Sequence, residues 1–423
     1  MKMMKKILAV SLALLFTAAL FAACGSKDKK KSQTAPGSDG AAESNSPDGL
    51  KAPVSDKPIN VNNGITENML IRSVHYEGDL SRLAAKLREA KNGKPQTVVF
   101  LGDSITAGST ADTQHQYVNA ASEWWKQNIN ANTEFHNAGI GATDSYYAAH
   151  RAGRDVFAHD PDYIFIEFIN DSDNDHYKET MESLIRKCLA RENTPAVVLI
   201  EMTLKGGGNA QGAHSAAAQH YGVPVLSYHD AVAPEVSAGN FSFDDISPDG
   251  THPNNIGHGW VAAIIENFIS GVYGKAESIT SAPEAFDENS APLTDIRYMD
   301  AKVIDSTDTA VCTDTGSFTE GATPYPFKHG WRTENGGTIT FEMKFKNLGM
   351  CFYKSTDGRT GTAKVSVDGK LAKLVNGNFP GGWGSYGAST ELYTSDTAAR
   401  HTVTVEIVEG ERQNFEILEW LVS

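Results

Sequence analysis

Residues 97–106 read Thr97-Val98-Val99-Phe100-Leu101-Gly102-Asp103-Ser104-Ile105-Thr106. The apolar and β-branched residues that open this stretch are typical of a buried strand. The glycine then permits a tight turn, so we expect Ser104 at the exit of the strand, with its hydroxyl at the edge of a sheet. Asp-Ser after a glycine is also ordinary turn chemistry, so this stretch alone does not establish a nucleophile.

Three polar residues elsewhere strengthen the case for Ser104. Asn170 follows a second apolar run, residues 163–168, and Asp249 precedes His252 by three positions. A serine, a histidine, a carboxylate and a side-chain amide donor are the groups that acyl transfer through a serine nucleophile requires. The combination therefore points to this class of chemistry.

Residues 66–275 alternate between helical and strand patterns. Apolar residues at helical spacing predict helices over 80–90, 117–129, 177–189, 213–221 and 256–269. Apolar runs predict strands over 97–101, 134–138, 163–168, 196–200 and 223–226. Alternating units with nearly continuous apolar strands favour an α/β fold, in which a parallel sheet is covered on both faces.

The pattern changes after a linker that we place at 276–295, which is rich in Ser, Pro, Ala and acidic residues. Polar and apolar residues alternate over 337–343, 363–367 and 401–407, and Asp368-Gly369 is a hairpin turn signal. Residues 296–423 are therefore expected to form an all-β domain, a two-sheet sandwich. Two domains are also expected from length, because the ordered part is too long for one core of ordinary size.

At this point the chain resembles the SGNH (GDSL-type) hydrolase family, which carries four short sequence blocks in a fixed order. The blocks are matched by Gly102-Asp103-Ser104, by residues 137–143, by Asn170-Asp171, and by Asp249-Gly250-Thr251-His252-Pro253. The resemblance covers roughly 200 residues. It implies a flavodoxin-like three-layer α/β/α domain and a serine esterase activity that needs no cofactor.

The same resemblance implies a role for each residue of the triad. Ser104 is the expected nucleophile, and His252 is the expected base that takes its proton and returns it to the leaving group. Asp249 would orient the histidine ring and stabilise the imidazolium. Some relatives work with Ser and His alone, so the contribution of Asp249 is expected to be smaller.

The expected oxyanion hole combines the side-chain amide of Asn170 with the backbone N–H of Ser104 and one N–H from the second block. The second block departs from the commonest family pattern, because Ala142 stands where relatives often carry glycine. We favour Gly141 as the donor because glycine tolerates unusual dihedral angles, and Ala142 stays as the alternative. Asp103 and Asn137 are expected to fix loops. The remaining histidines of interest are interpreted as structural or surface residues: His150, His214, His220 and His258.

The N-terminus has the pattern of an export signal. Residues 1–23 begin with lysines and continue with a short apolar run, and they resemble a bacterial lipoprotein signal in which Cys24 becomes the lipidated first residue. An ordinary secretory signal is the alternative. Residues 24–65 are polar and rich in Lys, Ser, Asp, Gly and Pro, so they are expected to be a disordered tether. The expected location is the extracellular face of the cell membrane.

Net charge and cysteine spacing bear on nucleic-acid binding, metal binding and disulfides. The net charge of −15 disfavours nucleic-acid binding. No Cys/His cluster has zinc spacing, so no metal site is expected. Cys188 falls on an apolar helical face. Export permits a disulfide between Cys312 and Cys351, and free buried cysteines are the alternative.

The C-terminal region resembles, at the level of pattern, the galactose-binding-like jelly rolls that accompany carbohydrate-active hydrolases. Four aromatic residues are either a sugar-stacking surface or ordinary core or rim residues: Trp331, Tyr353, Trp383 and Tyr386. The expected function is a cell-surface esterase that removes a small acyl group, acetyl first of all, from a carbohydrate. The alternatives are a lipid esterase or thioesterase, an O-acyltransferase on a polysaccharide or cell-wall sugar, and a non-catalytic carbohydrate binder.

Overall fold

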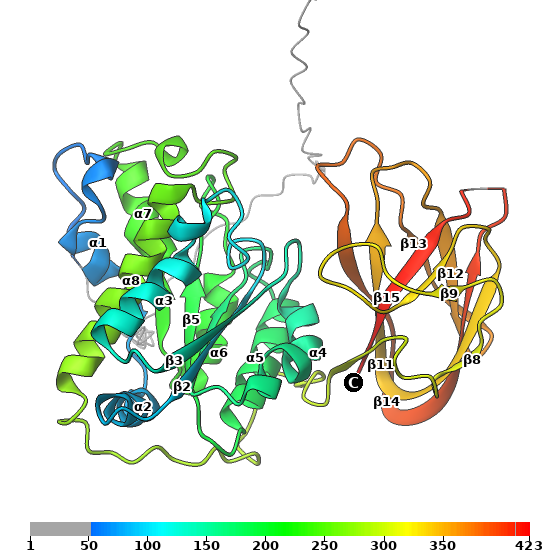
Figure 1. Cartoon of the computed structure of the whole chain (residues 1–423), viewed down its shortest axis with the longest axis horizontal. Coiled ribbons are helices and arrows are strands. Elements are labelled where there is room, and N and C mark those ends of the chain that lie inside the picture. The colour runs from blue at the N-terminus through cyan, green and yellow to red at the C-terminus, as the bar shows by residue number, and fades with distance from the viewer. Residues whose placement is uncertain (1–51, 411) are drawn as a thin grey trace, which may run out of the picture. The chain divides into compact units, whose positions relative to one another are not determined.

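A computed structural model of the protein describes residues 52–410 and 412–423. The predictions made for residues 1–51, which include the signal, Cys24 and most of the tether, lie outside the described residues. The described residues belong to one compact unit with an α/β lobe followed by a β lobe (Figure 1).

The α/β lobe is built on a sheet with the strand order β1-β6-β5-β4-β2-β3. Its strands are β1 (Val74–Tyr76), β2 (Gln96–Gly102), β3 (Thr133–Gly139), β4 (Tyr163–Glu167), β5 (Ala196–Glu201) and β6 (Val225–Ser227). Strands β2 to β6 are parallel, and β1 pairs antiparallel with β6 at the edge. The parallel strands have the flavodoxin-like order, in which the direction of winding reverses between β2 and β4. Ligands bind outside the carboxyl ends of strands at such a reversal.

Side chains alternate across the sheet, so each face has its own apolar core. Val98 and Phe100 join one core, and Val99 and Leu101 join the other. Helices on the first face are α1 (Glu67–Arg72), α2 (Ser81–Lys91), α3 (Tyr117–Asn128), α7 (Tyr228–Ser237) and α8 (Asn255–Lys275). Helices on the second face are α4 (Ser145–Asp155), α5 (Asp175–Leu189) and α6 (Gln211–His220). The prediction of an α/β fold with a parallel sheet is thereby confirmed.

The structure departs from the sequence prediction at the start of the ordered chain. Residues 52–65, which we placed in the tether, include a short 3-10 helix over Val61–Asn63. Ile59, Val61 and Ile65 pack against the first core, and the Arg72 guanidinium donates to the carbonyl of Pro53 at 2.8 Å. A few apolar residues spaced among polar ones are therefore enough to hold this segment on the lobe.

The β lobe is all-β and antiparallel, as predicted. Its strands are β7 (Lys302–Ile304), β8 (Cys312–Asp314), β9 (Thr319–Glu320), β10 (Trp331–Thr333), β11 (Thr338–Lys354), β12 (Thr362–Val367), β13 (Lys370–Asn376), β14 (Tyr386–Ile407) and β15 (Phe415–Val422). The long strands β11 and β14 pair along their lengths, with irregularities in register, and join the other strands into one hydrogen-bonded sheet. Assignment of this lobe as a jelly roll stays a prediction.

The predicted hairpin turn is present between β12 and β13. Val367 pairs with Lys370 across the turn. The φ angles of Asp368 and Gly369 are 50° and 75°, so both central residues are left-handed, as a type I′ turn requires.

The two lobes share a core instead of being joined only by a flexible linker. The core on the α4–α6 face continues into the β lobe through Cys351 of β11 and through Leu418 and Leu421 of β15. Strand β11 passes so close to α4 that a Cβ on Gly349 would lie 2.0 Å from the hydroxyl oxygen of Tyr146, so only glycine fits there.

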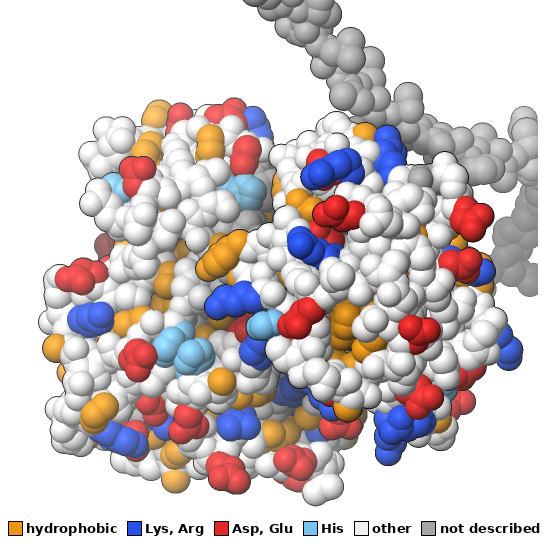
Figure 2. All heavy atoms as spheres, turned by 45° about the vertical axis from the view of Figure 1, so that its right-hand side comes forward, with side chains coloured by type: hydrophobic (Ala, Val, Ile, Leu, Met, Phe, Trp, Pro, Cys, Tyr) orange, Lys and Arg blue, Asp and Glu red, His pale blue; other side chains and the backbone are white. Residues whose placement is uncertain are grey.

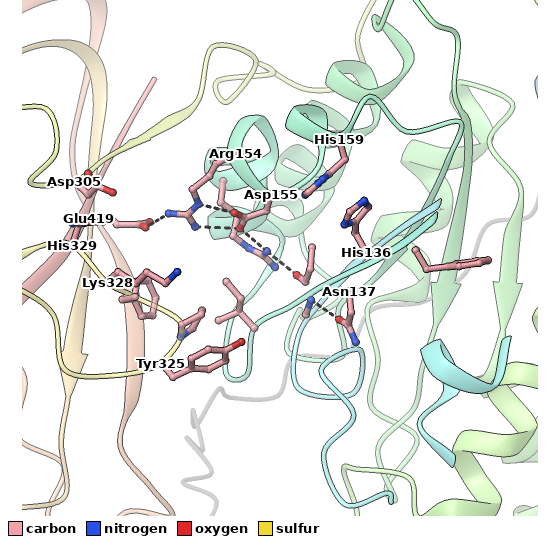
Figure 3. Close-up of a pocket in the computed structure, with 17 residues that line it drawn as sticks. His136, Asn137, Arg154, Asp155, His159, Asp305, Tyr325, Lys328, His329 and Glu419 are labelled. Atoms are coloured by element: carbon pink, nitrogen blue, oxygen red, sulfur yellow. Dashed lines mark hydrogen bonds and ion pairs between the residues drawn. The ribbon is translucent and has the colours of Figure 1, made fainter. Parts of the chain in front are cut away.

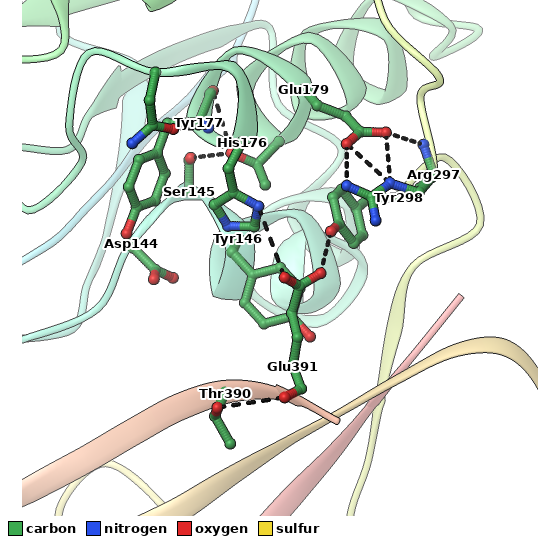
Figure 4. Close-up of polar contacts among 12 residues, drawn as sticks. Asp144, Ser145, Tyr146, His176, Tyr177, Glu179, Arg297, Tyr298, Thr390 and Glu391 are labelled. Carbon is green, nitrogen blue, oxygen red and sulfur yellow. Dashed lines mark hydrogen bonds and ion pairs between the residues drawn. The ribbon is translucent and has the colours of Figure 1, made fainter. Parts of the chain in front are cut away.

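Polar contacts reinforce this junction (Figure 4). The Arg297 guanidinium binds the Glu179 carboxylate of α5 with both its Nε and Nη2 nitrogens, and the hydroxyl of Tyr298 donates to Glu391 of β14 at 2.5 Å. The predicted linker also lies against the α/β lobe, because Arg186 of α5 donates to the carbonyl of Glu288 at 2.8 Å. Residues 276–295 therefore connect the lobes while being held on the surface of the α/β lobe by hydrogen bonds.

Candidate active site

Ser104 lies immediately beyond the carboxyl end of β2. The strand ends at Gly102, where a Cβ would lie 2.0 Å from Thr106 Oγ1 and 2.7 Å from the carbonyl oxygen of Glu167. The chain then makes a helical turn, in which the N–H of Ala107 donates to the carbonyl of Asp103 at 2.9 Å. Ser104 is 9% exposed, so its hydroxyl is held against the protein yet reachable from one side.

The structure brings Ser104, His252 and Asp249 into one hydrogen-bonded chain. His252 Nε2 lies 2.8 Å from Ser104 Oγ, and His252 Nδ1 lies 2.7 Å from Asp249 Oδ2. Asp249 Oδ1 accepts the backbone N–H of Thr251 at 2.9 Å and of His252 at 2.8 Å, so the loop before α8 fixes its own carboxylate. Burial would raise the pKa of Asp249, but the hydrogen bonds from His252 and the loop lower it. The carboxylate therefore stays ionised, facing the ring.

The expected oxyanion donors converge on the same serine. Asn170 follows β4, and its side-chain amide donates one hydrogen to the carbonyl of Thr143 at 3.0 Å, which leaves the second hydrogen of that amide for a ligand. A Cβ on Gly141 would lie 3.7 Å from Ser104 Cβ, so this turn passes directly beside the serine. Within the described residues, no hydrogen bond occupies the backbone N–H of Ser104, Gly141 or Ala142.

The backbone of the Gly141–Ala142 turn differs from what the sequence led us to expect. We favoured Gly141 because glycine tolerates unusual dihedral angles, but the left-handed residue of this turn is Ala142, with φ of 62°. The steric reason for choosing Gly141 over Ala142 is thereby removed, and both residues stay candidates for the backbone donor.

Asp103 and Asn137 hold loops, as their positions predicted. Asp103 Oδ1 accepts from the N–H of Ile105 at 3.0 Å, and its Oδ2 accepts from the N–H of Asn170 at 3.1 Å. Burial raises the pKa of Asp103 to about 7. The Asn137 amide donates to the carbonyl of Thr106 at 2.8 Å. These contacts tie the turn after β2 to the end of β3 and to the loop after β4, around Ser104.

Ser104 and His252 open into a cleft of about 760 Å³. The α/β lobe supplies one wall of this cleft. The β lobe supplies the other with Tyr325, Phe327, Trp383, Ser385, Tyr386 and Gly387. Trp383 is 73% exposed and stacks on Tyr386, with ring centroids 4.8 Å apart and an interplanar angle of 18°. We name Trp383 and Tyr386 the aromatic platform.

The four aromatic residues singled out in the sequence thus have different environments. Trp331 is buried in the core of the β lobe, where its ring packs edge-on against Phe341. Tyr353 is partly buried against the core that the two lobes share. Only the aromatic platform lines the cleft, and sequence reasoning missed Tyr325 and Phe327 because nothing local relates them to Ser104.

A second cavity of about 510 Å³ adjoins the cleft, and the two share Ile140, Tyr325 and Phe327 as lining residues. Figure 3 shows its side chains pointing inward from both lobes. Arg154 joins the carboxylates of Asp155 and Glu419, so the charges on that wall are compensated. The cavity therefore continues the cleft with a polar lining of both signs.

His214 was interpreted from the sequence as a structural or surface residue, and the structure shows which side chains it contacts. It is 1% exposed and lies between two carboxylates, those of Asp171 and Glu201, at 3.0 Å from each. Burial alone lowers the pKa of His214, but the neighbouring Glu201 charge and the two hydrogen bonds outweigh it and raise the pKa to about 10. No sequence spacing could have identified these partners, because they lie 13 and 43 residues away.

Further features of the described residues concern metal binding, membrane spans, cysteines and surface charge. Residues 52–410 and 412–423 contain no group of three His, Cys, Asp or Glu side chains arranged to hold a metal ion. In the same ranges, no helix has the length and apolar character needed to cross a membrane. Cys188, Cys312 and Cys351 are free thiols there, so the disulfide that the sequence permitted is not formed. Acidic and basic side chains are interspersed over the face in Figure 2.

Comparisons with known proteins bear on this geometry. Residues 100–260 match the model of the GDSL-like Lipase/Acylhydrolase family. Among curated protein sequences, no relative matches the chain.

Among solved structures, the chain is similar to a two-domain esterase, CEX, that is active on acetylated mannans. The identity is 30%, the TM-score is 0.77, and the match covers 84% of this chain and 98% of the esterase. The same esterase co-crystallized with mannopentaose gives a TM-score of 0.76 at 30% identity, over 84% of this chain and 97% of the other. The similarity therefore extends over both lobes. The chain belongs to the GDSL-like lipase/acylhydrolase family and is an ester-hydrolysing enzyme.

Proposed function

We propose that this protein is an acetyl esterase that acts on a carbohydrate polymer through Ser104, His252 and Asp249. The observation that carries the proposal is the continuous contact from Asp249 through His252 to Ser104, at 2.7 and 2.8 Å. This row of hydrogen-bonded side chains ends at Ser104, in a cleft whose opposite wall bears the aromatic platform. The similarity to an esterase active on acetylated mannans supports the acetyl group and the carbohydrate.

The geometry suits a two-step acyl transfer. His252 Nε2 accepts the Ser104 proton while Oγ attacks the ester carbonyl carbon, and the electron pair moves onto the carbonyl oxygen. The Asn170 amide and the backbone N–H groups of Ser104 and Gly141 or Ala142 donate to that oxyanion. When the intermediate collapses, the bond to the sugar oxygen breaks, and His252 returns the proton to that oxygen as the alcohol leaves.

The second step repeats the first with water. His252 removes a proton from a water molecule, whose oxygen attacks the acetyl-Ser104 carbonyl carbon. Collapse releases acetate and restores the Ser104 hydroxyl with the proton from His252. Asp249 stays ionised throughout and stabilises the imidazolium in both steps.

The shape and lining of the cleft favour a sugar polymer over a lipid. Flat exposed aromatic rings such as Trp383 suit the apolar faces of sugar rings, whereas the compensated ion pairs of the adjoining cavity suit hydroxyl groups. The two cavities share lining residues, so a chain of sugars has room to continue beyond the residue that is deacetylated.

A substrate panel on the purified chain tests the proposal. It compares an aryl acetate, aryl esters of longer acids, acetylated mannan, acetylated xylan and an acetylated amino sugar. We expect acetate release from a polysaccharide and poor turnover of long-chain esters. Preferred hydrolysis of long-chain esters, or transfer of acetyl to added sugar in place of water, would contradict the proposal.

A variant of the aromatic platform separates polymer recognition from chemistry. Trp383→Ala should raise KM on acetylated mannan by roughly fivefold and leave aryl acetate hydrolysis within about twofold, since a lost aromatic contact is worth about 1 kcal/mol. Leu374→Ala is the matched control, because Leu374 is an exposed apolar residue of the same lobe outside the cleft. Equal KM values for the two variants would remove the platform from substrate binding.

We also propose that the protein is anchored outside the cytoplasm by a lipid on Cys24. The charged start, the short apolar run and the small residues before Cys24 support this location. Metabolic labelling with a fatty acid should mark the full chain, and Cys24→Ala should abolish the label and release the protein from membranes. A Cys24→Ala protein that still sediments with membranes and carries label would contradict the proposal.

A further inference from the structure

We propose that His214, on helix α6, is a positioning residue of the oxyanion hole. It holds the hole in place by binding Asp171, which lies in the loop after β4. The proposal rests on the proposed function, because it assumes that Asn170 and the Gly141–Ala142 turn bind the oxyanion. It assigns His214 a part in the reaction although His214 lies apart from the Ser104–His252 pair.

Asn170 and Asp171 together hold the segment that follows the Gly141–Ala142 turn. The Asn170 amide donates to the carbonyl of Thr143 at 3.0 Å, and Asp171 Oδ1 accepts the N–H of Ser145 at 3.0 Å. Thr143 in turn donates its hydroxyl to the carbonyl of Ile140 at 2.6 Å. The turn with the backbone donors is therefore anchored to the same dipeptide that supplies the side-chain donor.

His214 holds the free side of that dipeptide. Its Nε2 lies 3.0 Å from Asp171 Oδ2, the oxygen that does not bind Ser145, and its Nδ1 lies 3.0 Å from Glu201 Oε1 at the end of β5. A neutral imidazole has a hydrogen on only one nitrogen, so two ionised carboxylate partners require the doubly protonated ring. The clamp is thus a buried cation between two anions.

The charged surroundings explain why the cation matters. Burial, and then the charge of Asp171, raise the pKa of Asp144 to about 7. Figure 4 shows Asp144 and Ser145 at the start of α4, where Ser145 also bonds Thr180 of α5. Asp103 faces the cluster from the turn after β2, and the charge of Asp171 contributes to its raised pKa. Without the imidazolium, the carboxylates of this cluster would repel one another across the loops that carry the donors.

The remaining titratable neighbours do not supply a substitute cation. The charge of Glu201 acts to raise the pKa of His75, on β1, and of His229, on α7. His75 binds Asp230 at 2.7 Å, however, and burial lowers the pKa of His229. His214 is the group that bonds both Asp171 and Glu201.

The proposal predicts a specific kinetic defect. In His214→Gln, one neutral amide can donate to only one of the two carboxylates at a time in this geometry, so the continuous link from Asp171 through α6 to Glu201 is broken and its positive charge is lost. We expect kcat for an aryl acetate to fall about 10- to 100-fold while KM changes less than about threefold, because oxyanion donors act chiefly in the transition state. The affinity for a boronic acid, which forms a tetrahedral adduct on Ser104, should fall by a similar factor.

Two controls separate positioning from general damage. His220→Gln changes an exposed histidine of the same helix, which bonds the carbonyl of Ala291, and should leave kcat and boronic acid affinity unchanged. Asp171→Asn removes the charge that His214 clamps and should reproduce the loss of kcat. A folded His214→Gln protein whose kcat and boronic acid affinity match those of wild type would overturn the proposal.

The wild-type protein offers a test that does not depend on a variant that folds. Nitrogen NMR of the histidine-labelled chain at pH 8 should show one buried ring with both nitrogens protonated among its 13 histidines. A neutral His214 ring at pH 8 in an active enzyme would overturn the clamp alone. Absence of hydrolysis of every ester by wild type would instead overturn the proposed function, and the NMR result would still decide the charge of His214.

Discussion

At the scale of single residues, the site is assembled from side chains that are each fixed by a short-range contact. Ser104 is placed by the turn after Gly102, and Asp249 is placed by the backbone of its own loop. The long-range contact between His252 and Ser104, at 2.8 Å, then follows from where β2 and the loop before α8 end. In the proposed mechanism, such preorganisation would let proton transfer and attack begin without rearrangement of the protein.

Replacement of the serine is the most direct prediction at this scale. Ser104→Ala should lower kcat on an aryl acetate by about a million-fold, because loss of a triad nucleophile removes the covalent route altogether. Thermal melting should match wild type, since the hydroxyl has no structural partner beyond His252 among the described residues. Turnover by the variant at a few per cent of wild type, free of contamination, would rule out Ser104.

Asn170 gives a second prediction, with a different kinetic signature. Asn170→Ala should lower kcat by roughly 100- to 1000-fold, with little change in KM, because the amide stabilises charge that develops only in the transition state. Hydrolysis kinetics and a thermal melt together check this. A fall in melting temperature without a separate loss of kcat in the folded enzyme would make Asn170 a structural residue.

The residues that sequence reasoning found and missed differ in how local their signal is. Ser104, Asn170, Asp249 and His252 stand in short ordered blocks, each beside a strand end or turn that apolar runs reveal. His214 gives no such signal, because its two carboxylate partners come from other segments and only the fold unites them. Buried charge clusters of this kind depend on tertiary contact, so periodicity does not detect them.

At the scale of elements, the predicted helices and strands were those with clear apolar spacing. Strands β2, β4 and β5 are apolar almost throughout, because both faces of the sheet are covered. Helix α4 was missed because polar residues occupy its buried positions. His150 is 2% exposed and Arg151 is 0% exposed, with Arg151 donating to the carbonyl of Gly102 at 2.9 Å. Because polar residues are buried in this helix, its buried face does not appear in the sequence as apolar residues at helical spacing.

The contacts of His214 with Asp171 and Glu201 lead to a prediction about how stability depends on pH. The pKa of His214 is raised to about 10, above the value of about 6.5 expected in the unfolded chain. Its contribution is therefore complete below about pH 6.5 and is lost progressively as the pH rises toward 10. Melting temperatures of wild type and His214→Gln should converge over that range. Parallel curves from pH 6.5 to pH 10 would mean that His214 is not charged in the folded protein.

At the scale of the whole molecule, the two lobes behave as one structure. The sequence analysis placed a linker between them at 276–295. The structure joins the two lobes, because the core on the α4–α6 face extends into β15 and the β lobe supplies one wall of the cleft. Composition shows where the α/β pattern of the sequence gives way to the all-β pattern. It does not show that the connecting segment 276–295 is held on the α/β lobe by side chains such as Arg186.

The buried carboxylate of Glu419 tests whether this junction holds the molecule together. Glu419 lies on β15, is 2% exposed, accepts from the Tyr147 hydroxyl at 2.7 Å and pairs with Arg154. Burial raises the pKa of Glu419 although Arg154 and Tyr147 oppose that shift. Glu419→Ala would leave the buried Tyr147 hydroxyl and an arginine short of partners.

We expect Glu419→Ala to lower the melting temperature by on the order of 5 °C, because the half-exposed Arg154 loses a partner and the buried Tyr147 hydroxyl is left unsatisfied, at a cost of about 2 kcal/mol. Glu419→Gln should cost less, since glutamine still accepts from Tyr147 and needs no buried charge. Glu406→Ala is the matched control on the same lobe: it breaks an exposed pair with Lys364 at 3.0 Å and should shift the melt by less than about 2 °C. Equal shifts for the Glu419→Ala and Glu406→Ala proteins would show that the lobes are stable without the contact between α4 and β15. A truncated chain without the β lobe would then be expected to hydrolyse small esters after all.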